Sequence, residues 1–161
     1  MHKIALVALL ATSVATPADA ADRYAGVKLA QSKYNITGVS YNPSSVGVMG
    51  GYTINPNLAV EAEYIYLGNT NSSSATAIGA SALAFYPGDQ PFSLFAKLSY
   101  THSIWKVSNQ VQNNSSFSQG LGCQYDATEA VSVRFGWDRY LVGNQVAINV
   151  DVLSITSMVR F

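Results

Sequence analysis

The sequence predicts an all-β fold, an eight-stranded antiparallel up-and-down transmembrane β-barrel. Eight segments alternate apolar with polar or small residues at a period of two, the connections between them alternate in length, and the N-terminus is typical of an exported protein. Only 11% of the 161 residues are charged, against roughly 25% in soluble domains. The formal net charge is zero, so no basic surface favours nucleic acid.

Residues 1–20 have the features of a secretory signal peptide. A short cationic start precedes an apolar run at residues 4–15, and Ala-Asp-Ala at residues 18–20 has the small-x-small pattern of a cleavage site. The run is too short for a membrane anchor, which needs about 20 apolar residues. We therefore expect residues 21–161 to form the mature barrel in the outer membrane of a Gram-negative bacterium.

The alternating segments define the expected strands. Several are about ten residues or longer, which suits a tilted membrane strand. The strands are expected at residues 24–35, 45–54, 58–67, 76–86, 92–105, 117–125, 130–142 and 151–161. The short turns are expected at residues 55–57, 87–91 and 126–129, and the longer loops at residues 37–44, 68–75, 106–116 and 143–150. Short periplasmic turns and longer outer loops are the pattern of a membrane barrel.

Charged side chains decide which face points inward. A Lys or Arg that faces lipid at mid-membrane costs roughly 2–4 kcal/mol, so we expect the polar faces to line the interior. The apolar faces, with tyrosines and Trp137, would meet lipid and its interfaces. Inside, Glu61 and Glu63 can neutralise Lys97 and Arg134. The expected interior ion network is Lys28, Glu61, Glu63, Lys97, Arg134 and Arg160.

Four further residues are weighed as candidate sites. Lys33 and Arg139 share the lipid face near the outer ends of the first and seventh strands, where they would contact lipopolysaccharide phosphates or simply snorkel to the interface. His102 precedes Ser103, but adjacent strand residues point to opposite faces, so we interpret His102 as an interface residue and not a general base. Cys123 is the only cysteine, which excludes an intramolecular disulfide.

Three motifs carry a family resemblance. The first strand has the pattern Tyr-x-Gly-x-Lys-Leu from Tyr24, a Gly-Gly-Tyr signature begins at Gly50, and the chain ends in Arg160-Phe161. In this order the motifs resemble the transmembrane domain of the outer membrane protein A family. The resemblance implies that Phe161 is the terminal aromatic signal read by the barrel assembly machinery.

Two departures from that family change the expected function. The family often carries a peptidoglycan-binding domain after the barrel, whereas this sequence ends at Phe161. The family's interior gate alternates acidic and basic residues at positions that correspond to Glu61, Leu83, Gln124 and Arg134 here. Because only Glu61 and Arg134 keep their charges, we expect a constitutively plugged barrel or a very small leak in place of a switchable pore.

Three functions are compared. The favoured one is a non-enzymatic barrel with a role in envelope integrity and a small or plugged pore, which needs no cofactor and no metal. Its partners would be outer-membrane lipids, lipopolysaccharide and the assembly machinery. A surface adhesin or host-interaction barrel is the alternative, although the outer loops are modest and nearly uncharged apart from Lys106. A lipid-modifying enzyme would need His, Ser and a carboxylate at one rim, which the spacing does not assemble.

Overall fold

The computed structural model describes residues 23–36, 39–70, 73–87, 91–107, 110–142 and 148–161. The predicted signal peptide lies outside these residues. Every element in the described part is a β-strand. No helix there is long and apolar enough to cross a membrane.

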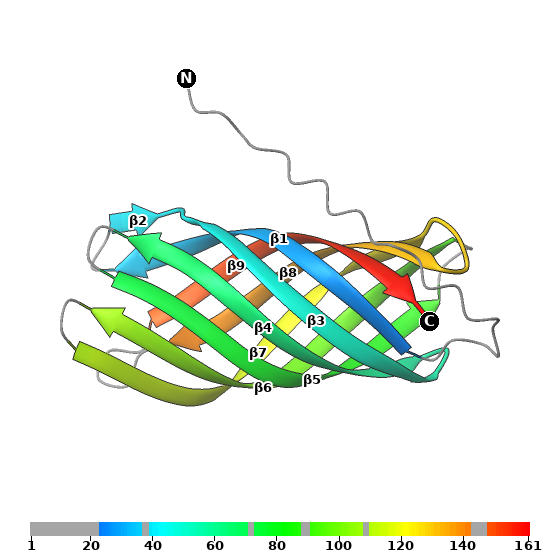
Figure 1. Cartoon of the computed structure of the whole chain (residues 1–161), viewed down its shortest axis with the longest axis horizontal. Coiled ribbons are helices and arrows are strands. Elements are labelled where there is room, and N and C mark those ends of the chain that lie inside the picture. The colour runs from blue at the N-terminus through cyan, green and yellow to red at the C-terminus, as the bar shows by residue number, and fades with distance from the viewer. Residues whose placement is uncertain (1–22, 37–38, 71–72, 88–90, 108–109, 143–147) are drawn as a thin grey trace, which may run out of the picture.

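Eight long strands close into an antiparallel barrel, as the sequence predicts (Figure 1). Each pairs with its neighbour along the chain, and β1 pairs with β9 to close the sheet. The barrel strands are β1 (Arg23–Ile36), β3 (Ser44–Asn55), β4 (Leu58–Thr70), β5 (Ser73–Pro87), β6 (Phe92–Val107), β7 (Gln110–Asp126), β8 (Val131–Val142) and β9 (Ile148–Arg160). A short strand, β2 (Val39–Tyr41), adds to the outer end of β1.

The start of β1, the end of β9 and the ends at which β3, β5 and β7 lead to the next strand lie at one end of the barrel, on the right in Figure 1. The turns after β3 and β7 lie where the sequence predicts them, whereas most of the predicted turn at residues 87–91 lies outside the described residues. Side chains stabilise two of them: the Asn57 N–H donates to Asn55 Oδ1 at 2.9 Å, and the Val131 N–H donates to Thr128 Oγ1 at 3.0 Å. This end is the periplasmic end of a membrane barrel.

The outer connections are shorter than predicted. Residues 106–116 were expected to form a loop, but β6 runs to Val107 and β7 starts at Gln110. Residues 68–75 likewise belong mostly to β4 and β5, and β9 already starts at Ile148. The prediction was wrong because Asn, Gln and Ser were read as loop formers. Above the membrane a strand is held by its neighbour's backbone and does not need an apolar face.

Two aromatic belts mark where the membrane would lie. The periplasmic belt is Tyr52, Tyr86, Phe92, Tyr125 and Phe161, and the outer belt is Tyr64, Tyr100 and Phe117, all of them exposed. On β6 the belts are eight residues apart, from Phe92 to Tyr100, which is about 20 Å for a strand tilted by about 40°. Exposed Val, Leu and Ile side chains fill the band between them. The apolar faces therefore point to lipid.

An arginine introduced into this apolar band tests whether the outer face of the barrel meets lipid. Ala96 lies midway between the belts of β6 and faces outward. We expect Ala96→Arg to lower the free energy of unfolding by about 2–4 kcal/mol, because a mid-membrane arginine is costly. Ile104→Arg, on the same face but beyond the outer belt, should cost less than about 1 kcal/mol. Reversible urea unfolding in phospholipid vesicles measures both; equal costs would contradict the placement.

Candidate functional site in the barrel interior

The alternation of side chains along each strand directs the charged side chains to the interior. Successive residues of a strand point to opposite faces, so the outward-facing apolar residues leave their polar neighbours inside. The structure places five of the six expected network residues there. Lys28, Glu61, Glu63, Lys97 and Arg134 are each between 4% and 7% exposed.

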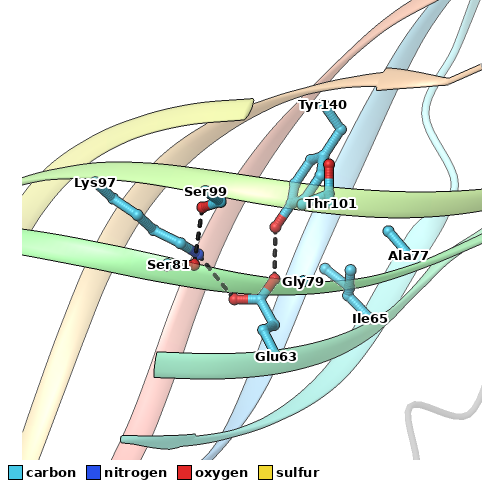
Figure 2. Close-up of a pocket in the computed structure, with 9 residues that line it drawn as sticks. All are labelled: Glu63, Ile65, Ala77, Gly79, Ser81, Lys97, Ser99, Thr101 and Tyr140. Carbon is cyan, nitrogen blue, oxygen red and sulfur yellow. Dashed lines mark hydrogen bonds and ion pairs between the residues drawn. The ribbon is translucent and has the colours of Figure 1, made fainter. Parts of the chain in front are cut away.

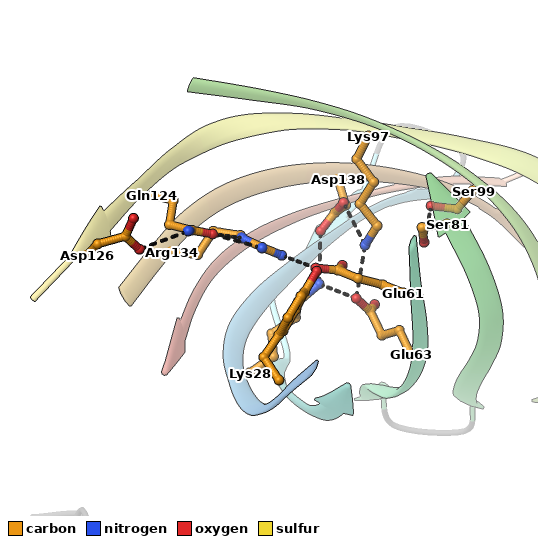
Figure 3. A network of polar contacts seen from close by, with 11 residues as sticks. Lys28, Glu61, Glu63, Ser81, Lys97, Ser99, Gln124, Asp126, Arg134 and Asp138 are labelled. Carbon is orange, nitrogen blue, oxygen red and sulfur yellow. Dashed lines mark hydrogen bonds and ion pairs between the residues drawn. The ribbon is translucent and has the colours of Figure 1, made fainter. Parts of the chain in front are cut away.

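Four charges form one cluster near mid-barrel, here called the four-charge cluster (Figure 3). Lys28 Nζ lies 2.6 Å from Glu63 Oε2 and 3.1 Å from Asp138 Oδ2. Lys97 Nζ lies 2.9 Å from the same Glu63 oxygen and 3.4 Å from Asp138 Oδ1. The Tyr140 hydroxyl donates to the other Glu63 oxygen at 2.5 Å. Each cation thus touches both anions, and the cluster is neutral.

A second ion pair lies closer to the periplasmic end. Arg134 Nη1 is 2.5 Å from Glu61 Oε1, and the Tyr24 hydroxyl donates to that oxygen at 2.7 Å. Arg134 also donates to Gln124 Oε1 through Nε at 3.2 Å and Nη2 at 2.9 Å. Its guanidinium lies 5.0 Å from the centre of the Phe95 ring, a favourable cation–π distance. Both members of the pair therefore have further contacts: Glu61 accepts from Tyr24, and the Arg134 guanidinium contacts Gln124 and Phe95.

Two residues of the interior differ from expectation. Asp138 supplies the third interior anion. Together with Glu61 and Glu63 it balances the charges of the three interior cations. The sequence places it on the polar face of its strand, but its role was missed because the cross-strand register was unknown. Arg160 has inward parity but is the last residue of β9, and its side chain is 25% exposed. There it pairs with Asp126 at 2.8 Å on the rim, and Gln124, which donates to the same Asp126 oxygen at 2.9 Å, links this rim pair to Arg134.

A layer of apolar side chains occupies the interior between the four-charge cluster and the outer end of the barrel. It consists of Tyr34, Ile65, Leu67, Ala75, Ala77, Tyr140, Val142, Ile148, Val150 and Val152. Figure 2 shows the space where this layer meets the ions, with Ile65 and Ala77 beside Glu63 and Tyr140. This space and the one around the ions each have room for about one water molecule at most. Side chains therefore fill the interior around the ions almost completely.

The proposed lipopolysaccharide contacts lie in one row on the outer surface. Lys33 and Arg139 both pair in register with Asp151 on β9, which lies between them. Asp151 accepts from Arg139 Nε at 2.8 Å and Nη2 at 3.1 Å. The Arg139 guanidinium also lies 5.2 Å from the centre of the Trp137 ring. Asp151 was not considered from the sequence, and it leaves the row with one net positive charge.

His102 has a partner that the sequence does not reveal. Ser103 points inward and is buried, as strand parity predicts. Ser115, opposite His102 on β7, brings its Oγ to 2.8 Å from the His102 Nδ1. Register alone creates this pair. Within the described residues, no carboxylate hydrogen-bonds to His102 or Ser115, so the pair offers a base and a hydroxyl without an acidic third member.

Residues 4–161 match the family described as the outer membrane protein beta-barrel domain. The chain belongs to this family. No curated protein matches it. Among solved structures it is similar to Neisserial surface protein A, with a TM-score of 0.69 and 22% identity over 87% of this chain and 97% of that one. Neisserial surface protein A and Ail, which is described next, are eight-stranded barrels of the outer membrane protein A kind.

Two more structures show how widely the fold is shared. Ail, the attachment invasion locus protein of Yersinia pestis, was solved in complex with the heparin analogue sucrose octasulfate. It has a TM-score of 0.65 and 16% identity, covering 86% of this chain and 97% of its own. The outer membrane enzyme PagL has a TM-score of 0.50 and 11% identity, covering 83% of this chain and 99% of its own. At these identities the likeness concerns the fold alone.

Breaking the inner ion pair tests its contribution. We expect Arg134→Leu to lower the free energy of unfolding by about 3–5 kcal/mol, because it leaves Glu61 buried and unpaired. Adding Glu61→Gln should restore much of that loss. Arg160→Leu, which breaks the partly exposed rim pair with Asp126, should cost less than about 1 kcal/mol. The urea midpoint of the gel-mobility shift between folded and unfolded forms measures all three; an unchanged midpoint for Arg134→Leu would exclude a stabilising pair.

Proposed function

We propose that this chain is a sealed, non-enzymatic barrel, exported through its signal peptide to the outer membrane of a Gram-negative bacterium, where it supports envelope integrity. One observation carries the proposal: in the described interior three cations are paired with three anions, and the two spaces beside these ions each hold about one water molecule at most. A barrel filled in this way offers no aqueous path to a solute.

Two barriers in series support the seal. A permeating ion would have to break the salt bridges of the four-charge cluster and then cross the apolar layer above it. Leu67, Val150 and Val152 in that layer have no exposed surface, and narrow apolar constrictions block ions by excluding water. Opening the Arg134–Glu61 pair removes neither barrier.

Single-channel recording tests the seal. We expect the refolded mature chain and its Arg134→Ala variant both to be silent in planar bilayers, since the four-charge cluster and the apolar layer remain in the variant. Folding is verified beforehand by gel mobility, and a known porin added afterwards shows that the bilayer reports conductance. Discrete openings that appear or grow in Arg134→Ala would identify Glu61 and Arg134 as a gate and overturn the proposal.

We also propose that the outer-surface row around Lys33 contacts lipopolysaccharide phosphates. Arg139 is two residues outward of Trp137 on the same face of β8, toward the outer end of the barrel. Two guanidinium nitrogens of Arg139 already donate to Asp151. Lys33, exposed on β1, is therefore the better candidate for an incoming phosphate.

Lipid-dependent stability tests this contact. Wild-type protein should unfold at a higher temperature in vesicles that contain lipopolysaccharide than in phosphatidylcholine alone. Lys33→Gln should lose part of that difference, equivalent to about 1 kcal/mol for one surface charge. Lys106→Gln, which removes an exposed charge at the tip of the β6–β7 hairpin, is the matched control. Equal losses in both variants would show that only net charge matters.

A further inference from the structure

The charges of the outer-surface row alternate in sign. The row consists of Lys33 on β1, Asp151 on β9 and Arg139 on β8, which are register neighbours on three adjacent strands. Neighbouring strands lie about 4.8 Å apart. Gln119 on β7, in register with Arg139, continues the row with an exposed amide. The wall therefore presents an ordered sequence of a cation, an anion and a second cation, which differs from a simple basic patch.

The ion pair within the row leaves bonding groups open to a ligand. Asp151 accepts two bonds from Arg139, whereas a carboxylate offers about four acceptor sites. The side chains of Asp151 and Arg139 are 24% and 45% exposed. Lys33 is exposed, and the described part of the chain gives it no salt-bridge partner. Asp151 can thus accept from a cationic group while Lys33 donates to an anionic one.

Apolar side chains lie directly on the periplasmic side of the row, on the same faces of the strands. Trp137 precedes Arg139 by two residues on β8, and its ring centre lies 5.2 Å from the guanidinium. Leu153 follows Asp151 by two residues on β9 and is 68% exposed. A molecule that contacts the row and these side chains together needs a charged group joined directly to an apolar chain. A lipid meets that requirement, and a soluble anion does not.

The alternating charges select among lipid headgroups. The row has one net positive charge, which attracts any anionic lipid, but a phosphate placed beside Asp151 would be repelled by the carboxylate. A phosphate and a primary ammonium joined by two carbon atoms can instead contact neighbouring strands, which lie about 4.8 Å apart. An ammonium also brings three N–H donors for the open acceptor sites of Asp151. A trimethylated amine brings none.

We propose that the outer-surface row binds a phosphoethanolamine group, with its phosphate on Lys33 and its ammonium on Asp151. Arg139 holds the Asp151 carboxylate through two hydrogen bonds. Asp151 is the residue that determines which headgroup binds. This binding rests on the phosphate contact of Lys33 proposed above and specifies the lipid that makes it. The group can be part of a phospholipid or a substituent of lipopolysaccharide.

The fluorescence of Trp137 reports which lipid lies beside the row. The sequence contains two tryptophans, and Trp105→Phe leaves Trp137 alone while keeping an aromatic ring against the apolar layer. The refolded mature chain with this change is placed in phosphatidylcholine vesicles. Increasing amounts of a lipid with brominated acyl chains are then included, because bromine quenches nearby tryptophan. Brominated phosphatidylethanolamine, phosphatidylglycerol and phosphatidylcholine give three relative association constants, and gel mobility verifies that each variant is folded.

We expect phosphatidylethanolamine to bind at least about three-fold more tightly than phosphatidylcholine, as for one exposed ion pair, and more tightly than phosphatidylglycerol. Attraction by net charge alone would favour phosphatidylglycerol, which is the anionic lipid of the three. Asp151→Asn should abolish the preference for phosphatidylethanolamine and strengthen binding of phosphatidylglycerol, because Arg139 is then free for phosphate.

A matched control keeps the net charge and changes only the order of the charges. Asp151→Arg combined with Arg139→Asp retains an ion pair between β8 and β9 but places two cations side by side on β9 and β1. This double variant should also lose the preference for phosphatidylethanolamine. Tighter binding of phosphatidylglycerol by the unmodified row, equal constants for the three lipids, or a preference that Asp151→Asn leaves intact would each overturn the proposal.

Lipopolysaccharide with and without phosphoethanolamine substituents distinguishes the two sources of the group. If lipopolysaccharide carries the ligand, the substituted form should raise the unfolding temperature in vesicles more than the unsubstituted form, and Asp151→Asn should remove the difference. Equal effects of both forms, together with the preference for phosphatidylethanolamine, would identify a phospholipid as the source. Loss of lipopolysaccharide stabilisation in Lys33→Gln without any preference for phosphatidylethanolamine would retain the phosphate contact and overturn the headgroup selectivity alone.

Discussion

The closure of the sheet by β1 and β9 is the constraint on which the rest of the structure depends. Lipid offers no hydrogen bonds, so each backbone group within the membrane needs a partner in the protein. The eleven register pairs between β1 and β9, from Tyr24–Arg160 to Tyr34–Val150, supply the last of them. An eight-stranded barrel has an interior just wide enough for side chains. Closure therefore forces both a lipid-compatible outer face and a crowded interior.

The crowded interior explains why its charges cancel. Lys28, Lys97 and Arg134 would each be costly if buried alone, and Glu61, Glu63 and Asp138 neutralise them within hydrogen-bonding distance. The paired charges also define the register, because a shift of one residue would turn them to lipid. Tyr24 and Tyr140 add one donor to each Glu. The apolar layer then occupies the outer half, where none of the described residues places a charged side chain inside the barrel.

The sequence predicts which face of a strand each residue lies on. It does not predict the position of the residue along the barrel axis or its partner on the next strand. Alternation alone assigned Glu61, Glu63 and Lys97 to the inner face and Leu98 and Tyr100 to lipid. It could not tell that Arg160 lies at the rim or that Asp138 faces Lys28, because these depend on how far each strand is shifted against the next. The pairs His102–Ser115 and Arg139–Asp151 escaped for the same reason. The outer hairpins were underestimated because polar strands above the membrane resemble loops in composition.

The same constraint separates the barrel into two functional zones. Between the aromatic belts each strand must be paired and the interior must be filled, so this zone supports a stable, sealed wall. Beyond the outer belt water can satisfy backbone groups, and β6 and β7 run on as a paired hairpin as far as Val107 and Gln110. The polar side chains of β6 and β7 in that zone are free to vary without disturbing closure. Changes of sequence in the outer hairpins therefore place no demand on the packed interior below.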